Sequence, residues 1–520
     1  MNTPLSVDEA LRLARAHARR GEFERAAGLY RAILERNPKH KKARKALKEL
    51  SRSAPPRVTM QEDFNRLLQL YQEGKVDAVL KLSERLCRDF PGQPMPFNIR
   101  GAMLNRHGQF KEAIECFEHA LRLEPAYADA LHNLGVALEG TGRLEEALAA
   151  GERCVALNPR DPAAHTRLAD VLRRDGQLDK AVSCYQAALG LDPKAADTHL
   201  ALGATLREMV RPREAITAYR AALDLDPRNA TAHELIGDAF VLMADLHSAI
   251  TWYRDALRIE PNRARYHTKL GIALLKQGKT EEALGALNHA HNLSPGDDET
   301  KHFLNAARGA NAGQAPRGYV TGLFDNYAAR FDTHLKEQLG YSTPELLPAL
   351  LRDKGGLEEP VARAVDMGCG TGLAGVACRE LASSITGIDL SSRMLEQADK
   401  TDAYESLLRG DLVAVLQSLQ GSFDLFLAAD VFVYIGDLAP VLAAVAARSK
   451  QGTLLAFSTE AAADQDMELR ASGRYAHGKD YVRRVAAEHG FTEVDCSENN
   501  LRKEEGEWIT GNLYLMRFTG

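Results

Sequence analysis

From about residue 60 to residue 297, hydrophobic and polar positions repeat every 34 residues, and each unit predicts two helices joined by a turn. In one unit the pattern runs through Ala130–Gly135, Gly142–Ala147 and Leu157–Pro159. Small residues at the eighth and twentieth places allow the two helices to pack closely, and a proline ends the second helix. Seven prolines keep this step: Pro91, Pro125, Pro159, Pro193, Pro227, Pro261 and Pro295.

An earlier unit ends at Pro38, so 19 extra residues separate it from the next unit. They include a basic helix, Lys41–Arg52, and a break, which predicts a first domain over residues 1–52 and a linker over residues 53–59. We expect eight units in all, over roughly residues 7–297. A helix from Asp298 to Arg308 would then cap the main solenoid, residues 60–308, because each unit buries its apolar face only against its neighbours.

The units resemble the tetratricopeptide repeat in their period and at several positions together. The resemblance implies an α solenoid, and we expect its concave surface to bind a protein or peptide partner. Some units depart from the repeat pattern, since Gly151, Ser83 and Leu287 stand where an aromatic residue is usual. The candidates for gripping an extended peptide are Asn and Arg side chains: Asn98, Asn105, Asn133, Arg173, Arg174 and Arg207.

Four histidines share the 34-residue step: His165, His199, His233 and His267. Equivalent positions in stacked units lie about 8–10 Å apart or more, whereas zinc needs nitrogen ligands at about 2.0–2.1 Å. We therefore interpret these histidines as packing residues and expect no metal site.

From residue 364 onward, short apolar runs alternate with helical segments, which predicts an α/β doubly wound, Rossmann-like domain. We expect strands over residues 364–367, 385–389, 405–409, 424–429 and 453–458, and helices over residues 372–384, 391–400, 437–449 and 478–489. The last two strands, 491–496 and 511–518, have no helix between them, so one should run antiparallel at the edge. Residues 309–318 break the periodicity and predict a linker, which places this domain at residues 319–520.

The turn after the first of these strands carries three glycines at alternate positions, Gly368, Gly370 and Gly372, and a helical pattern follows. Bare backbone at such a turn lets a ligand come close. Asp366 stands at the end of this strand, and Asp389 ends the second strand, 21 residues after the first glycine. An acid at that distance accepts hydrogen bonds from ribose hydroxyls. The pattern therefore predicts a nucleoside cofactor.

Two cofactor classes compete for this loop, since residues 370–375 also spell GxGxxG, the weak dinucleotide pattern. A dinucleotide would place an anionic pyrophosphate on the loop, where Asp366 would repel it. S-adenosylmethionine instead carries a sulfonium cation and an ammonium group, which a carboxylate stabilises. Asp366 and Asp389 together therefore favour S-adenosylmethionine.

Residues 319–520 resemble a class I S-adenosylmethionine-dependent methyltransferase, and the whole chain resembles the bacterial family of methyltransferases that carry tetratricopeptide repeats. The resemblance implies that the three glycines line the methionine part of the cofactor. It implies that Asp366 orients that part and that Asp389 holds the ribose. Around the adenine it implies contacts from Leu390, Met394, Gly410, Asp411 and Leu412.

The acceptor side is predicted after the fourth strand and just before the last helix. Asp430 and Tyr434 follow a strand end where such sheets hold ligands, so we expect them to face the methyl group or the acceptor. Arg474, with Tyr475 beside it, offers a site for an anionic group of the substrate. His477 acts either as a general base or only as a locally bonded residue at the helix start, and both interpretations stay open. A base is required only if the nucleophile arrives protonated.

Composition and charge further limit the kinds of partner that this protein is expected to bind. A chain of 520 residues with 45% hydrophobic and 26% charged residues predicts a soluble protein of two to four domains. A net charge of −5 predicts no general attraction to nucleic acid or to an anionic membrane, and no apolar run is long enough to span a bilayer. Seven scattered cysteines without a CxxC pair argue against disulfides and zinc. We expect a cytoplasmic protein.

Three functions fit these patterns. The first is an S-adenosylmethionine-dependent methyltransferase whose repeats recruit a protein as substrate or scaffold, with a small-molecule acceptor as a further possibility. The second is a non-catalytic adaptor, in which the repeats bind a partner and the second domain senses cofactor. The third, kept because of the GxGxxG overlap, is a nicotinamide-dependent oxidoreductase.

Overall fold

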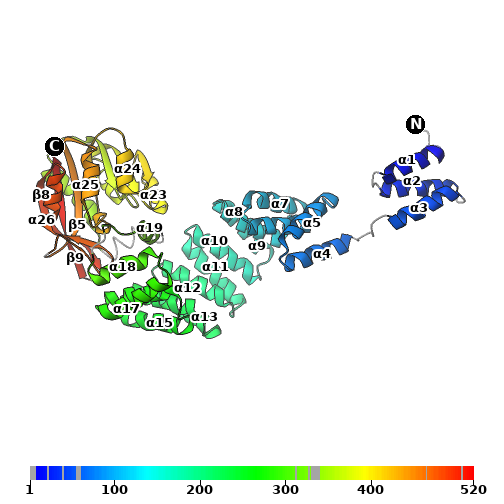
Figure 1. The fold of residues 1–520 in the computed structure, drawn as a ribbon, viewed down its shortest axis with the longest axis horizontal. Helices are drawn as coiled ribbons and strands as arrows, with labels where there is room; N and C mark the ends of the chain where they lie inside the picture. The colour runs from blue at the N-terminus through cyan, green and yellow to red at the C-terminus, as the bar shows by residue number, and fades with distance from the viewer. Residues whose placement is uncertain are drawn as a thin grey trace. The chain divides into compact units, whose positions relative to one another are not determined.

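The computed structural model describes residues 7–19, 23–37, 40–53, 60–310, 313–325, 328, 340–463, 465–504 and 507–520 (Figure 1). The chain divides into two compact units, Met1–Asn158 and Pro159–Gly520. The later repeats therefore belong to the same unit as the α/β sheet. The predicted linker at residues 53–59 lies outside the described residues, apart from Ser53 at the end of a helix.

The first unit is helical throughout its described residues. Its helices are α1 (Val7–Arg19), α2 (Phe23–Arg36), α3 (Lys41–Ser53), α4 (Met60–Gln72), α5 (Val76–Asp89), α6 (Pro94–Arg106), α7 (Phe110–Leu123), α8 (Ala128–Gly140) and α9 (Leu144–Leu157). The helix α3 confirms the basic helix predicted after the first repeat. The remaining helices form the antiparallel pairs α1/α2, α4/α5, α6/α7 and α8/α9.

The second unit continues the repeats with four more pairs and a capping helix. Its helices are α10 (Pro162–Arg174), α11 (Leu178–Leu191), α12 (Ala196–Glu208), α13 (Pro212–Leu225), α14 (Ala230–Leu242), α15 (Leu246–Ile259), α16 (Ala264–Lys276), α17 (Thr280–Leu293) and α18 (Asp298–Arg308). Each second helix ends just before a proline of the ladder, so that Asp192 caps α11 and Asp226 caps α13. The predicted α solenoid is confirmed.

Glycines at the eighth place bring the paired helices into contact. A Cβ atom added to Gly203 would lie 2.5 Å from the ring of Tyr219, and one added to Gly237 would lie 2.6 Å from the ring of Tyr253. Gly135 differs, since its nearest neighbour would be the Ala147 carbonyl oxygen at 3.9 Å. The difference arises because Gly151 stands at the position of the aromatic ring.

We expect Gly203→Ala to destabilise the repeats and Gly135→Ala to stabilise them. Tyr219 is fully buried, so its ring has little room to move away from the new methyl group, and overpacking costs about 1–3 kcal/mol. At Gly135 the methyl group fits, and alanine is better than glycine inside a helix by about 0.5–1 kcal/mol. Urea unfolding followed by circular dichroism measures both variants. Equal changes in the urea midpoints of Gly203→Ala and Gly135→Ala would contradict this explanation.

Three of the four recurring histidines bond to the proline that ends the preceding repeat, and the fourth bonds within its own repeat. The Nε2 atoms of His165, His199 and His267 lie 2.9, 3.1 and 2.8 Å from the carbonyl oxygens of Pro159, Pro193 and Pro261. His233 uses Nδ1, which lies 3.0 Å from the carbonyl oxygen of Asn229. These contacts fasten the turn between successive units, as expected for packing residues.

Nine strands of the described residues form one mixed sheet. They are β1 (Val361–Met367), β2 (Ala382–Asp389), β3 (Ser406–Arg409), β4 (Phe423–Ala428), β5 (Ser449–Ala461), β6 (Met467–Leu469), β7 (Tyr475–His477), β8 (Phe491–Glu504) and β9 (Glu507–Phe518). The parallel order is β3-β2-β1-β4-β5, and β7 continues from β5 in parallel. The strand β9 runs antiparallel to β5, and β8 pairs antiparallel with β9 as the edge. The predicted antiparallel pairing at the edge is thus confirmed.

Helices cover both faces of the sheet. They are α19 (Arg317–Asp325), α21 (Thr343–Lys354), α22 (Leu373–Ala377), α23 (Ser392–Asp399), α24 (Leu412–Ser418), α25 (Ala439–Ala446) and α26 (Lys479–Glu488), with a 3₁₀ turn, η2 (Phe432–Tyr434). Alternate residues of one strand enter different cores: Phe426 packs with α24, α25 and α26, whereas Leu425 packs with α21. This alternation is the doubly wound arrangement that was predicted.

One predicted helix is wrong. The helix expected over residues 372–384 ends at Ala377, and β2 already begins at Ala382. Cys378, Leu381 and Ile385 are all buried in one core cluster, and their spacing imitates a helical stripe. Here the stripe arises from a tight turn followed by a buried strand. The helix α24 and the short strands β6 and β7 were not predicted.

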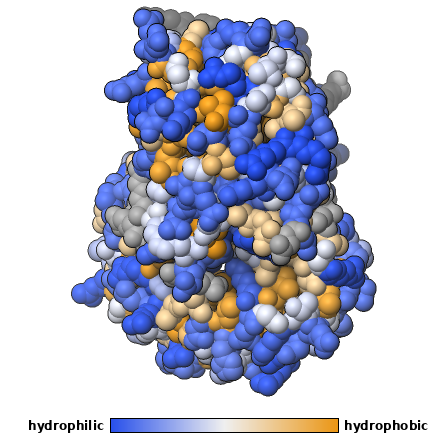
Figure 2. Space-filling view, turned by 90° about the vertical axis from the view of Figure 1, so that its left-hand side faces the viewer, coloured by the Kyte–Doolittle hydropathy of each residue, from blue (hydrophilic) through white to orange (hydrophobic). Residues whose placement is uncertain are grey.

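Part of the predicted linker is bound to the sheet domain. Gln314 forms a β-bridge with Ile435, and the carbonyl oxygen of Gly313 accepts hydrogen bonds from the backbone of Gly436 and Asp437. The helix α19 begins at Arg317, within the predicted linker. In the part of the chain that the structure describes, no helix has the length and apolar character needed to cross a membrane. Figure 2 shows a mostly hydrophilic face on which apolar residues gather around a hollow.

Candidate functional site

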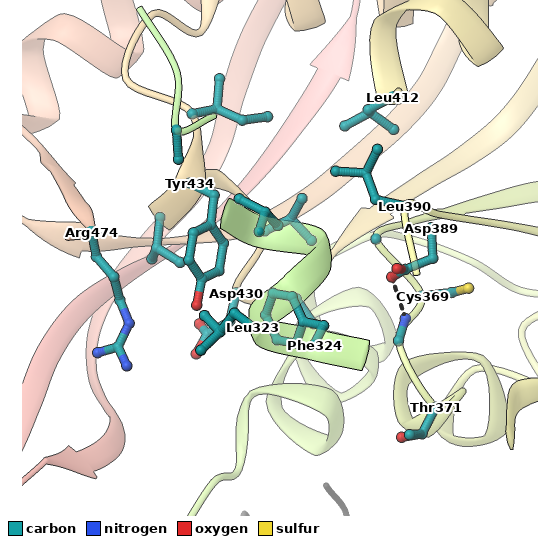
Figure 3. Close-up of a pocket in the computed structure, with 18 of the residues that line it drawn as sticks. Leu323, Phe324, Cys369, Thr371, Asp389, Leu390, Leu412, Asp430, Tyr434 and Arg474 are labelled. Carbon is teal, nitrogen blue, oxygen red and sulfur yellow. Dashed lines mark hydrogen bonds between the residues drawn. The ribbon is translucent and has the colours of Figure 1, made fainter. Parts of the chain in front are cut away.

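A cavity of about 480 Å³ lies at the carboxyl ends of β1, β2, β3 and β4. In Figure 3, Asp389, Leu390 and Leu412 lie on one side of this cavity, and Asp430, Tyr434 and Arg474 lie on the other. We call these the cofactor side and the acceptor side. Parallel α/β sheets place their ligands at this edge.

The glycine loop forms part of the cofactor side. Gly368, Gly370 and Gly372 have φ angles of +68°, +53° and +97°, which other residues rarely adopt. A Cβ atom on Gly368 would lie 2.5 Å from the side chain of Val431. Gly368 and Gly370 line the cavity as predicted, whereas Gly372 does not and turns the chain into α22.

Asp389 holds the loop and faces the cavity. Its Oδ2 atom accepts a hydrogen bond of 3.0 Å from the backbone of Gly370, and its Oδ1 atom accepts one of 2.8 Å from Ser391 (Figure 3). Burial raises the pKa of Asp389 above its ordinary value, against these hydrogen bonds. The side chain is therefore preorganised, with its carboxylate beside a loop of bare backbone.

Asp411 and the helix α19 complete the cofactor side. Asp411 caps α24 through a 3.2 Å hydrogen bond to the backbone of Ala414 and pairs with Arg317 at 3.0 Å. At its other end, α19 is fastened by a 2.5 Å hydrogen bond between Ser391 and Asp325. Apolar side chains of α19, together with Leu390 and Leu412, line the cavity between these ends. The walls thus combine a flat apolar surface with acids at its rim.

Two predicted cofactor residues do not line the cavity. Asp366 is buried, and its Oδ2 atom accepts a 2.7 Å hydrogen bond from Tyr404. Burial raises the pKa of Asp366 to about 6, and the nearby charge of Asp389 adds to the effect. Met394 is fully buried in α23, so it supports the site from within the core. Their predicted contacts with a cofactor stay predictions.

The acceptor side contains three predicted residues, Asp430, Tyr434 and Arg474. Asp430 adopts a φ angle of +55°, unusual for a residue other than glycine, at the end of β4. Its backbone donates a 2.8 Å hydrogen bond to Ser458, and its Oδ1 atom accepts one of 2.9 Å from the same hydroxyl group. These bonds hold Asp430 in a strained conformation of the kind found at functional sites.

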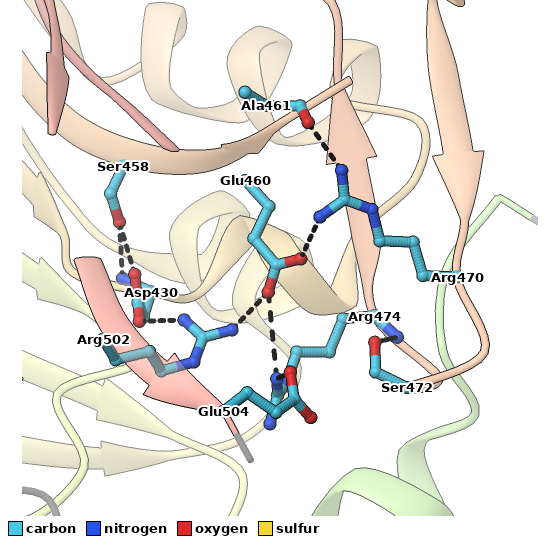
Figure 4. A network of polar contacts seen from close by, with 9 residues as sticks. All are labelled: Asp430, Ser458, Glu460, Ala461, Arg470, Ser472, Arg474, Arg502 and Glu504. Carbon is cyan, nitrogen blue, oxygen red and sulfur yellow. Dashed lines mark hydrogen bonds and ion pairs between the residues drawn. The ribbon is translucent and has the colours of Figure 1, made fainter. Parts of the chain in front are cut away.

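Sequence analysis missed a buried ionic network behind this side (Figure 4). Arg502 of β8 is 6% exposed at its side chain and bridges Asp430 and Glu460. Arg474 pairs with Glu504 at 2.8 Å, and Arg470 pairs with Glu460 at 3.0 Å. The sequence around Arg502 is a run of charged residues that resembles a solvated strand. No local signal marked it as part of a site.

His477 and Tyr475 lie outside the cavity lining, although both were predicted as site residues. Both side chains are fully buried, and His477 Nε2 lies 3.0 Å from the carbonyl oxygen of Gly436. Burial lowers the pKa of His477 to about 4. A neutral, buried imidazole bonded to the backbone fits the second of the two interpretations, a local structural role. We therefore do not assign it as a base.

The low pKa of His477 predicts a pH-dependent stability of the sheet domain. In the unfolded chain the imidazole has its ordinary pKa of 6.5. The unfolded state therefore takes up a proton first as the pH falls, and stability present above pH 6.5 is lost toward pH 4. Between pH 6.5 and pH 4, we expect the free energy of unfolding to fall by about 3 kcal/mol more in the wild type than in His477→Gln.

Two tryptophans simplify the measurement, because Trp252 lies in the repeats and Trp508 lies in β9. In a Trp252→Phe background, Trp508 fluorescence reports urea unfolding of the sheet domain at each pH. Parallel pH profiles for the wild type and His477→Gln would contradict the pKa assignment.

The last repeat helix packs directly on the segment that carries Arg474. His302 Nε2 lies 2.8 Å from the carbonyl oxygen of Gly473, and His302 is 2% exposed. A Cβ atom on Gly473 would lie 2.9 Å from the Phe303 ring and 3.0 Å from the Tyr319 hydroxyl group. Two further repeat residues, Leu242 and Lys276, line the cavity itself from the last positions of α14 and α16. The repeats are therefore part of the acceptor side.

Family models match both parts of the chain. A model described as a methyltransferase domain matches residues 365–455. Models described as tetratricopeptide or TPR repeats match residues 7–50, 105–162, 169–209, 213–243 and 245–278. The chain thus combines tetratricopeptide repeats with a methyltransferase domain.

Two curated relatives are similar to the methyltransferase part. Ribosomal protein L11 methyltransferase of Thermotoga maritima is 27% identical over 151 residues, which cover 28% of this chain and 47% of the relative. Malonyl-[acyl-carrier protein] O-methyltransferase of Enterobacter lignolyticus is 30% identical over 144 residues, which cover 28% of this chain and 55% of the relative. The chain spans about half the length of the curated relatives that it matches.

Solved structures are similar to the repeats. The crystal structure of MamA protein is 23% identical, covers 33% of this chain and 94% of its own, and has a TM-score of 0.31. The structure of Pseudomonas aeruginosa pilF is 20% identical, covers 40% of this chain and 96% of its own, and has a TM-score of 0.35.

Proposed function

We propose that this protein transfers the methyl group of S-adenosylmethionine to an acceptor that the repeats help to recruit. One observation supports the choice of cofactor above all. Asp389 is a half-buried carboxylate on the wall of the cavity beside a backbone-only loop, and Asp366 is a fully buried carboxylate behind that wall; burial raises the pKa of both. A sulfonium and an ammonium group stabilise such carboxylates, whereas a pyrophosphate destabilises them.

The other residues of the cofactor side fit an adenosyl group. Asp389 has carboxylate lone pairs left for ribose hydroxyls after its two backbone hydrogen bonds. Leu390 and Leu412 offer apolar faces for the adenine, and Asp411 lies next to them as an acceptor for its amine. When bound, the cofactor supplies an activated methyl group, and this chain supplies binding, orientation and exclusion of water.

Calorimetry on the full chain tests the choice of cofactor. We expect S-adenosylhomocysteine to release heat on binding and NAD to release none under the same conditions. Binding of NAD alone would favour the oxidoreductase, and binding of neither would contradict the proposal. A matched titration with adenosine shows how much of the affinity depends on the amino acid part, which the carboxylates Asp366 and Asp389 favour.

Two observations support recruitment of a protein by the repeats. Leu242 and Lys276 place the ends of two repeat helices on the wall of the cavity, so an acceptor that enters the site passes the repeats. The names of both curated relatives also specify a protein or a protein-bound group.

The alternative function is a non-catalytic adaptor that binds cofactor only as a signal. Incubation of the full chain with cofactor labelled at the methyl group and a cell extract separates the two functions. Label transferred by the wild type and not by Asp389→Ala supports an enzyme. Cofactor binding without any transfer supports the adaptor.

A further inference from the structure

The acceptor side presents cations to its ligand, and each of these cations pairs with at least one carboxylate. Arg474 and Arg502 line the cavity, and their side chains are 23% and 6% exposed. Three arginines (Arg470, Arg474 and Arg502) face four carboxylates (Asp430, Glu460, Glu468 and Glu504). A ligand carboxylate that displaces one of these carboxylates from its arginine leaves the net charge around that arginine unchanged.

Glu504 is the member of the network that is easiest to replace. Its side chain is 27% exposed, compared with 1% for Glu460 and 13% for Asp430. It is the last residue of β8, and among the described residues its side chain forms one ion pair, with Arg474. Glu460 instead pairs with Arg470 and Arg502 and lies 3.9 Å from Arg474.

Each carboxylate among the described lining residues of the cavity already has a hydrogen-bond or ion-pair partner. None of these residues is a histidine, and four are carboxylates. Asp389 bonds to the loop, Asp411 to Arg317, Asp430 to Arg502 and Glu504 to Arg474. An amine or alcohol that arrives protonated needs a base in order to attack, whereas a carboxylate is already ionised at neutral pH.

We infer that the methyl acceptor is a carboxylate that binds Arg474 in the place of Glu504. This inference rests on the proposed function. One carboxylate oxygen accepts hydrogen bonds from the guanidinium group, and the other stays free to attack. Lys276 adds a further cation to the same cavity from the repeats. An ammonium acceptor would instead meet these cations with its own positive charge, and a phosphate dianion would bring one more negative charge than the Glu504 carboxylate that it displaces.

The transfer balances without a proton. The free carboxylate oxygen donates an electron pair to form a bond to the methyl carbon, and the carbon–sulfur bond breaks with its pair remaining on sulfur. The sulfonium becomes a neutral thioether, and the carboxylate becomes a neutral methyl ester. Because the ester has lost its charge, Arg474 no longer attracts it, so Glu504 returns and the product leaves.

Binding of glutarate, which carries the same carboxylate group as the Glu504 side chain, tests the site directly. The full chain is saturated with S-adenosylhomocysteine, and binding is followed by saturation-transfer NMR. Neutral glutaramide and inorganic phosphate are the matched controls. We expect glutarate to bind and glutaramide not to bind. Phosphate binding more tightly than glutarate would overturn the choice of a carboxylate.

Two substitutions should act in opposite directions. Arg474→Gln removes the binding cation and should weaken glutarate binding at least tenfold. Glu504→Gln removes the competing carboxylate and should strengthen it several-fold. If the network only supported the fold, both substitutions would weaken glutarate binding. Such a result, or no glutarate binding to Glu504→Gln, would overturn the inference.

The product gives a second, chemical test. After transfer of labelled methyl groups into a cell extract, alkali releases methyl esters as volatile methanol and leaves N-methyl groups and ethers intact. We expect the label added by the wild type, beyond that with Asp389→Ala, to be volatile after alkali. Alkali-stable label counts against the inference, whereas cofactor binding without any transferred label counts against the proposed function. Failure of S-adenosylhomocysteine to bind would instead contradict the proposed function itself.

Discussion

Asp389→Ala is expected to weaken binding of S-adenosylhomocysteine at least a hundredfold. The carboxylate lines the cavity and is held in place by backbone hydrogen bonds from Gly370 and Ser391. Hydrogen bonds to a charged group contribute about 1.5–3 kcal/mol each, so losing two from ribose hydroxyls costs about 3 kcal/mol or more, equivalent to the hundredfold change. The substitution also frees Gly370, so the loop loses part of its order.

Calorimetry on the full chain measures this effect, with two further variants as controls. Asp399→Ala makes the same chemical change at an exposed position of α23 and should leave the affinity unchanged. Asp389→Asn keeps an oxygen for Gly370 but loses the charge, and we expect an intermediate affinity. If Asp389→Ala binds as tightly as Asp399→Ala, the ribose assignment is wrong. Circular dichroism confirms that the repeats stay folded.

The cofactor side was predictable from the sequence because its determinants are local. Gly368 and Gly370 form the turn after β1. Asp389 is the last residue of β2, and Asp411 follows β3. A parallel sheet brings such strand ends to one edge whatever the remaining sequence. Strand order and pattern are therefore enough to gather these residues. The same pattern does not tell which residues of the following helix line the cavity: Met394 of α23 lies in the core, and its predicted contact with a cofactor stays a prediction.

The acceptor side was only partly predictable because it depends on distant pairings. Arg502 reaches Asp430 across 72 residues, and Glu460 reaches Arg502 across 42. Whether a charged residue on an edge strand is solvated or buried depends on the pairing of β8 with β9 and of β9 with β5, which no local period encodes. His477 depends on distant packing in the same way. A histidine before a helix left a general base and a local structural role both open, and the burial and the bond to Gly436 that favour the second come from tertiary packing.

Phe303→Ala is expected to destabilise the sheet domain, although Phe303 belongs to the last repeat helix. Its ring is 3% exposed, packs edge-on against Tyr319 at 5.7 Å between ring centroids, and covers Gly473. Truncation of a buried phenylalanine costs about 3–5 kcal/mol. Because the contacts of this ring extend from α18 to the segment that carries Arg474, we expect part of this loss to appear in the sheet domain and not only in the repeats.

Phe240→Ala is the matched control, since Phe240 packs against the same repeat core as Phe303. In the Trp252→Phe background, Trp508 fluorescence should show a lower urea midpoint for Phe303→Ala and an unchanged midpoint for Phe240→Ala. Phe303→Ala should also weaken glutarate binding, because Gly473 positions the arginine that follows it. Equal midpoints for the two variants would mean that the repeats and the acceptor side are energetically independent. The repeats would then serve only to recruit a partner and not to build the site.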